Sequence, residues 1–245
     1  MCWNQEVSLN TFLFSGFVLG LVVYNNAYTQ YKIRSLNNIW VYLFILIVIS
    51  MQLVEFFIWR NIQNDGYNRM FTIIAYLVVC LQPVASLMLL SDEKIRNYLL
   101  MGYLILAIPY ISYMFLNNKF KTIVSPLGHL NWNFNVTDPV FYGWCFFFFF
   151  SFFYERKWPY LIFGLITIVL FLYKYSWDKS IGSMWCWFIN SASLFLATYL
   201  LFYLPYKGET KGFPLNPFLA GEPRSSESAS LIPAPALPLF LVLIE

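Results

Sequence analysis

The sequence sets one carboxylate inside a long apolar run. Residues 49–60 read ISMQLVEFFIWR, and Glu55 is the only acidic residue among them. A carboxylate inside an apolar segment is costly unless it has a partner or a function, so it is a functional candidate. Gln52 lies three residues earlier, and in a helix the two side chains share one face. Glu55 and Gln52 are therefore the first candidates for a polar binding site.

Three further residues have side chains that can bind or react. His129 is the only histidine, and Cys2 and Cys186 are two of the four cysteines. Cys, His and Glu are the residue types of a thiol nucleophile with its base, or of a mixed zinc site. The spacing supports neither, because the chain has no C-x-x-C and no H-E-x-x-H motif. The sequence predicts no metal site and no cofactor, and a disulfide between Cys2 and Cys186 stays open.

A proline interrupts another apolar run. Pro83 has no N–H to donate, so a helix through it leaves the carbonyl one turn earlier, near Val79, without its partner. Gln82 or Ser86 could bind this carbonyl. The sequence therefore predicts a kink at Pro83 and adds Gln82 to the candidate binding residues.

The composition is that of a membrane protein. Of 245 residues, 60% are hydrophobic, 22% aromatic and only 11% charged, whereas soluble domains have roughly 25% charged residues. The net charge is +3, but the Lys and Arg residues form no cluster, which argues against a nucleic-acid binding surface. The bilayer is the expected partner.

The apolar residues form blocks long enough to cross a bilayer, which takes about 20 residues of helix. The blocks cover residues 9–28, 37–59, 70–90, 97–117, 139–154, 158–175 and 180–204. They predict an all-α membrane protein, a bundle of about seven transmembrane helices within residues 1–206. The fifth and sixth blocks are short, so five or six spans stay open. We expect the run Phe146–Phe150 to face lipid.

The chain changes character after residue 206. Residues 207–245 hold half of the twelve prolines and no tyrosine. We expect a disordered Pro-, Ser- and Ala-rich tail outside the fold, and whether it is native stays open.

Seven alternating spans place the N-terminus and the second, fourth and sixth breaks on one side of the membrane. Cys2, Glu55, His129, Cys145 and Cys186 then fall in one half of the bilayer. Lys and Arg number eight on the opposite side and six on this one, which favours an outward N-terminus and an inward C-terminus.

The plainer interpretations of these residues are structural. Glu55 could pair with Arg60 or Arg69, or lean towards the interface. His129 could be an ordinary hydrogen-bonding residue of a loop.

Four short motifs resemble those of a group of seven-helix membrane proteins found in large DNA viruses, with distant bacterial relatives. They are MCWNQEVS at the start, QLVEFFIW, GHLNW and GSMWCWF, and the resemblance covers residues 1 to about 205. Phe56 stands where that group would have a glycine. The resemblance implies that Cys2, Glu55, His129 and Cys186 belong to one site, and no established activity comes with it.

Three functions fit these residues. The first is binding, transport or sensing of a small polar solute or cation, in a polar pocket near the N-terminal face formed by Glu55, Gln52, His129, Cys186, Cys2 and Gln82. The second is a structural or anchoring protein of a virion or host membrane. The third is a membrane-embedded enzyme with a Cys/His/Glu site.

Overall fold

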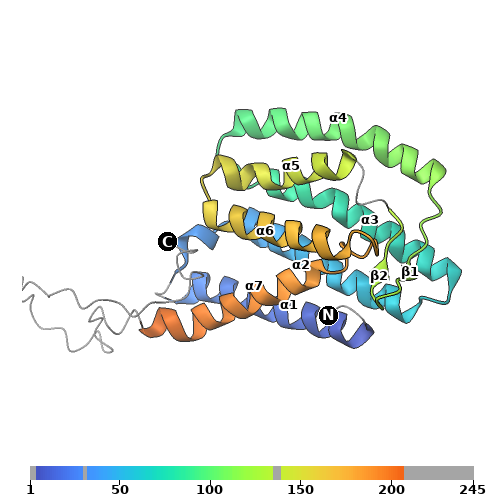
Figure 1. The fold of residues 1–245 in the computed structure, drawn as a ribbon. Helices are drawn as coiled ribbons and strands as arrows, with labels where there is room; N and C mark the ends of the chain where they lie inside the picture. The colour runs from blue at the N-terminus through green and yellow to red at the C-terminus, as the bar shows by residue number, and fades with distance from the viewer. Residues whose placement is uncertain (1–3, 30–31, 135–138, 207–245) are drawn as a thin grey trace, which may run out of the picture.

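The computed structural model describes residues 4–29, 32–134 and 139–206, apart from the side chains of Arg34, Trp185 and Cys186. This part of the chain forms seven α-helices that run up and down (Figure 1). They are α1 (Gln5–Tyr28), α2 (Ile39–Arg60), α3 (Asp65–Leu87), α4 (Glu93–Asn117), α5 (Pro139–Tyr154), α6 (Trp158–Tyr175) and α7 (Trp185–Thr198). The smaller elements are a 3-10 turn (Arg34–Leu36), the strands β1 (Ile123–Val124) and β2 (Leu130–Asn131), and a π-helical segment (Tyr199–Tyr203) that continues α7.

Six of these helices are long and apolar enough to cross a membrane, and α5, with 16 residues, is shorter. The last of the six extends from Trp187 through the π-helical segment to Tyr206. The predicted all-α membrane fold is confirmed, and the chain is a polytopic membrane protein. α7 begins at Trp185 instead of residue 180, because residues 176–184 form a loop of turns, and α3 covers Asp65–Leu87 instead of residues 70–90.

Short polar side chains start the first four helices. Asn4, Asn38, Asn64 and Asp92 each accept a hydrogen bond from a backbone N–H in the first turn of the helix that follows. Side chains of this kind satisfy N–H groups that a helix leaves without a partner at its start. The starts of α1 to α4 are therefore fixed locally.

The helices pack in an order that leaves α4 at the edge. α1 packs on α2 and α7, α2 on α3, α3 on α5, and α5 on α6. α4 leans on α3 and buries only Tyr103 and Met114 among its side chains. Figure 1 shows it, in green, on the outside of the bundle.

Small polar residues join α1 to α7. Asn190 donates to the Thr11 hydroxyl at 2.8 Å, and Ser193 donates to the Ser15 hydroxyl at the same distance. Helices in lipid associate through small side chains and interhelical hydrogen bonds. The first and last spans are thereby joined.

Pro83 lies inside α3, and its freed carbonyl is satisfied from another helix. The indole Nε1–H of Trp144, on α5, donates to the Val79 carbonyl at 2.8 Å. The Tyr103 hydroxyl, on α4, donates to the next carbonyl, that of Cys80, at 2.7 Å. The expectation that Gln82 or Ser86 would bind the Val79 carbonyl is therefore wrong, because a longer side chain from a neighbouring helix reaches it.

The phenylalanine run does not face lipid as a whole. Phe147, Phe148 and Phe149 are buried, while Phe146 is exposed. Five consecutive residues point to all sides of a helix, so α5, packed between α3 and α6, must bury most of them.

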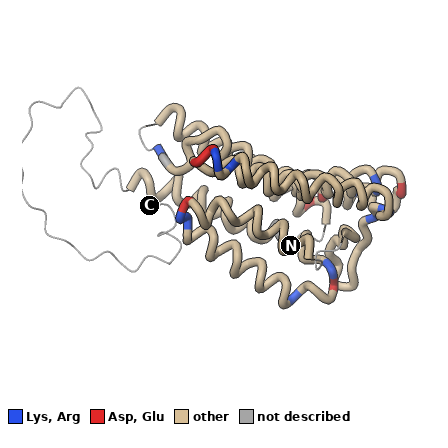
Figure 2. The backbone as a smooth tube through the Cα atoms, turned by 90° about the horizontal axis from the view of Figure 1, so that it is seen from above, with Lys and Arg blue, Asp and Glu red and all other residues tan. Residues whose placement is uncertain are grey.

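The charged residues gather at the two ends of the bundle (Figure 2). At one end, Lys121 pairs with Asp65 and Ser125 bonds Asp178, which joins the second, fourth and sixth breaks. At the other end, Glu155 accepts hydrogen bonds from Ser91. The breaks therefore meet in the two sets that alternating spans predict.

Candidate functional site

A small β-hairpin caps the end of the bundle where α2 ends and α3 begins. β1 and β2 pair antiparallel, with Val124 opposite Leu130. Between them, the turn Ser125–Gly128 has Pro126 as its second residue and Gly128 with φ +78 as its last. Proline presets this turn and glycine accepts a positive φ without strain. The turn places His129 directly before the second strand.

Asn68 and Thr72 of α3 hold the hairpin in place. The Asn68 amide donates to the Thr122 carbonyl and accepts from the Thr122 N–H, both at 2.9 Å. The hydroxyls of Thr72 and Thr122 lie 2.7 Å apart. All three residues are buried, so the first hairpin strand is fixed to α3 by a paired polar contact.

A buried carboxylate joins the hairpin to the loop before α7. Oδ2 of Asp178 accepts from the hydroxyls of Ser125 and Ser180, both at 2.7 Å. Its Oδ1 is buried and has no hydrogen-bond partner within the described residues. One oxygen of this acid is thus structural, and the other is free to accept.

Trp132, just past β2, fills the space between this loop and α2. It shares a hydrophobic cluster with Met51, Val54 and Ile58 of α2. A Cβ built on Gly182 would come within 2.4 Å of its ring. The absence of a side chain at Gly182 is what lets the indole pack this close to the loop.

Glu55 lies on α2 between Val54 and Ile58, in the same helical turns that pack against Trp132, and is fully buried. Neither carboxylate oxygen has a hydrogen-bond partner in residues 4–29, 32–134 and 139–206. The indole N–H groups of Trp59 and Trp132 are likewise buried without a partner in this part of the chain. We use the name cap site for Glu55, Trp59, His129, Trp132 and Asp178.

The candidate residues named from the sequence fall in three places. Gln52 is buried one turn before Glu55, and His129 is buried in the hairpin. Gln82 is also buried, but it lines a separate apolar cavity deeper in the bundle. Cys2 and the side chain of Cys186 lie outside the described residues, so the question of a disulfide between them stays open.

The described ion pairs are Arg96 with Glu93 and Lys121 with Asp65. Glu55 takes no part in either, and no ion pair in the described residues joins it to Arg60 or Arg69. The same residues contain no group of three or more His, Cys, Asp or Glu side chains that could hold a metal ion.

His129 is the ionisable imidazole of the cap site. Its ring meets the edge of the Tyr175 ring, with centroids 5.7 Å apart. Burial lowers its pKa, and nearby Asp178 opposes this effect. The imidazole is therefore held neutral near pH 7.

The lowered pKa of His129 predicts a loss of stability in mild acid. The unfolded chain binds the proton more readily than the folded one, so the free energy of unfolding falls as pH drops below about 6.5. We expect the unfolding temperature in detergent to fall between about pH 7.5 and pH 5.5. His129→Gln should flatten this slope, because the chain has no other histidine. An unchanged slope in the variant would contradict the assignment.

Sequence reasoning missed Asp178 and its partners Ser125 and Ser180. Asp178 stood in a short break between spans, where an acid next to Lys179 has the pattern of a solvated loop. Asp178 is buried because it contacts Ser125 of the hairpin, which lies 53 residues earlier in the sequence. Trp59 and Trp132 fitted ordinary interfacial tryptophans, and only their unpartnered N–H groups distinguish them.

No protein-family model matches the chain, and comparisons with curated proteins and with solved structures give no match.

Proposed function

We propose that this membrane protein binds a small organic cation at the cap site, as a transporter or a sensor of that solute. The proposal is supported by the sign of the buried charge. Among the described residues, the buried acids are Glu55 and Asp178, and no Lys or Arg is buried with them. Burial keeps His129 neutral. Buried carboxylates need a compensating positive charge, and a bound cation would supply it.

The aromatic side chains around Glu55 suit a cation that carries carbon. Trp59 and Trp132 both pack in the hydrophobic cluster on α2. Indole faces attract ammonium groups, most strongly where water is excluded. A methylated or alkyl amine would meet a carboxylate and two indoles here. A bare metal ion would find fewer than three of its usual ligands among the described residues.

The proposal also covers the orientation of the protein in the membrane and its family. With an outward N-terminus, as the Lys and Arg distribution favours, the cap site would open towards the outside. We also propose, on the motifs around Glu55, His129 and Cys186, that the chain belongs with the seven-helix proteins of large DNA viruses.

Ligand-induced stabilisation tests the binding. A ligand that binds the folded state alone raises the unfolding temperature with its concentration. For wild type in lipid nanodiscs, we expect choline or methylammonium to raise it. The uncharged alcohol in which carbon replaces the nitrogen of choline should not. Glu55→Gln should weaken the response about tenfold or more, because it removes a charge-assisted contact.

Glu93→Gln is the matched control, since Glu93 is exposed and pairs only with Arg96 within its own helix. It should respond to amines as wild type does. An equal response in Glu55→Gln, or none to any amine in wild type, would reject the proposal. The second result would favour a structural role in the membrane.

A further inference from the structure

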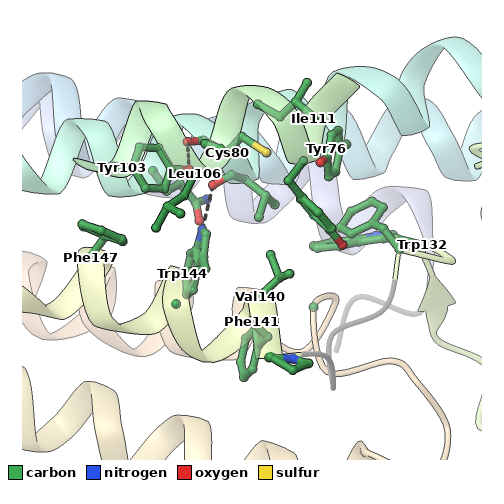
Figure 3. A pocket seen from close by; sticks show the side chains of 18 of the residues that line it. Tyr76, Cys80, Tyr103, Leu106, Ile111, Trp132, Val140, Phe141, Trp144 and Phe147 are labelled. Atoms are coloured by element: carbon green, nitrogen blue, oxygen red, sulfur yellow. Dashed lines mark hydrogen bonds between the residues drawn. The ribbon is translucent and has the colours of Figure 1, made fainter. Parts of the chain in front are cut away.

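A second feature of the bundle is a cavity of about 720 Å³ between α3, α4 and α5. Ligand pockets typically have volumes of roughly 300–1,000 Å³. Its wall runs along α4 from Tyr103 to Ile111, which is roughly 12 Å at 1.5 Å per residue. Figure 3 shows Tyr76 and Trp132 at one end and Tyr103 and Phe147 at the other. Glu55 does not line this cavity, but Trp132 does, so the cavity adjoins the proposed cation site and shares one side chain with it.

The side chains that line the cavity determine which class of ligand it can bind. No Asp, Glu, Lys, Arg or His lies among the described residues of the wall, which is mostly aliphatic and aromatic. Trp144 donates to the Val79 carbonyl that the proline in α3 leaves free, and Tyr103 donates to the neighbouring Cys80 carbonyl (Figure 3). These two groups hold the wall together and are not available to a ligand.

Two other polar groups of the wall are buried and have no nitrogen or oxygen partner among the described residues. The Tyr76 hydroxyl and the Trp132 indole N–H make no hydrogen bond to N or O atoms of the described residues. Both side chains are more than nine-tenths buried. The Tyr76 hydroxyl interacts with the Cys80 thiol, a weak hydrogen-bonding group. A hydroxyl and an indole N–H that have no N or O partner in an apolar wall favour a ligand that supplies one.

We propose that this cavity binds an uncharged bilayer lipid that carries a hydroxyl or ester carbonyl. Its polar group would accept from Trp132 and bond the Tyr76 hydroxyl, at the end next to the hairpin. Its apolar part would extend between α3, α4 and α5 towards Phe147. The source is the membrane itself, because the cavity lies between membrane-spanning helices and α4, at the edge of the bundle, buries few of its side chains. A phosphate or carboxylate head would find no cationic side chain among the described residues of the wall.

Photolabelling with a monoacylglycerol that carries a diazirine in its acyl chain tests this proposal. Wild-type protein in phosphatidylcholine nanodiscs is illuminated with the probe, and the labelled peptides are mapped by mass spectrometry. We expect label on the cavity faces of α3, α4 and α5, displaced by unlabelled monoolein. The corresponding fatty acid, which is anionic, should displace it less well.

Two glycines give a matched pair of variants. A Cβ on Gly143, which lines the cavity, or on Gly102, which does not, would meet nothing within 4 Å. Gly143→Leu should fill part of the cavity and lower the labelling about tenfold, while Gly102→Leu should leave it unchanged. Tyr76→Phe removes one neutral hydrogen bond and should lower it roughly fivefold.

Three results would overturn the proposal. They are label spread over lipid-facing surfaces in every variant, equal labelling of Gly143→Leu and wild type, and displacement by the fatty acid at least as good as by monoolein. Glu55→Gln should label as wild type does, so failure of the cation site and failure of the lipid site are distinguishable.

Discussion

Replacing Gly182 with alanine should destabilise the protein by about 1–3 kcal/mol, the usual cost of inserting a methyl group into a filled space. The new Cβ would come within 2.4 Å of Cζ3 and 2.6 Å of Cε3 of Trp132. The indole is buried in a cluster with Met51, Val54 and Ile58, so a shift away from the new methyl group would disturb this packing. The measurement is the free energy of unfolding in detergent. Because Trp132 belongs to the cap site, the response to amines should weaken as well.

Two other glycines separate these effects. Gly102→Ala meets nothing within 4 Å, and inside a helix it should be neutral or stabilising by up to about 1 kcal/mol. A Cβ on Gly164 would lie 2.5 Å from the Phe149 ring, between α6 and α5. Gly164→Ala should therefore destabilise the bundle and leave the amine response intact. Wild-type stability in Gly182→Ala would show that the indole can move, and would remove the argument for a rigid cap.

The fold could be predicted from the sequence because lipid imposes its constraint locally. Each spanning helix needs its own apolar block, and a charged break ends it. Residues 139–154 and 158–175 were assigned with the bounds that α5 and α6 have in the structure. The predicted start of the last helix, residue 180, is five residues before the observed one, because Ile181, Gly182 and Met184 continue the apolar pattern. They instead belong to a loop in which Ile181 and Met184 are buried and Gly182 packs against Trp132 of the segment after β2.

The site could be predicted only in part. Alternation of spans was enough to expect Glu55 and His129 at the same end of the bundle. The contacts that build the cap site join residues far apart in sequence, such as Ser125 to Asp178 and Trp132 to Gly182. No spacing rule connects them. The partner of the Val79 carbonyl was missed for the same reason, because Trp144 lies 65 residues away on another helix.

The second large effect concerns the charge of Glu55 itself. An ionised carboxylate that is buried without a partner costs free energy that a neutral glutamine of the same shape avoids. We expect Glu55→Gln to be more stable than wild type near pH 8, by about 2–3 kcal/mol on insertion scales for acids in membrane helices. The difference should shrink as pH is lowered towards about 4, the ordinary pKa of a glutamate in the unfolded chain, because below it the unfolded wild-type chain also carries a neutral side chain at this position. Unfolding free energies of both proteins, measured across this range, give the comparison.

Glu93→Gln serves again as the control and should change stability by less than about 1 kcal/mol, since its side chain is 81% exposed. A Glu55→Gln protein that is less stable at every pH would mean that the carboxylate is held by a cation of the chain itself, which is the structural role. A more stable variant would mean that wild type keeps a costly charge for a ligand. An amine bound at Glu55 should then stabilise wild type alone, and saturating amine should close the gap between the two proteins. The same pair of proteins thus measures both the cost of the buried charge and the compensation that the ligand provides.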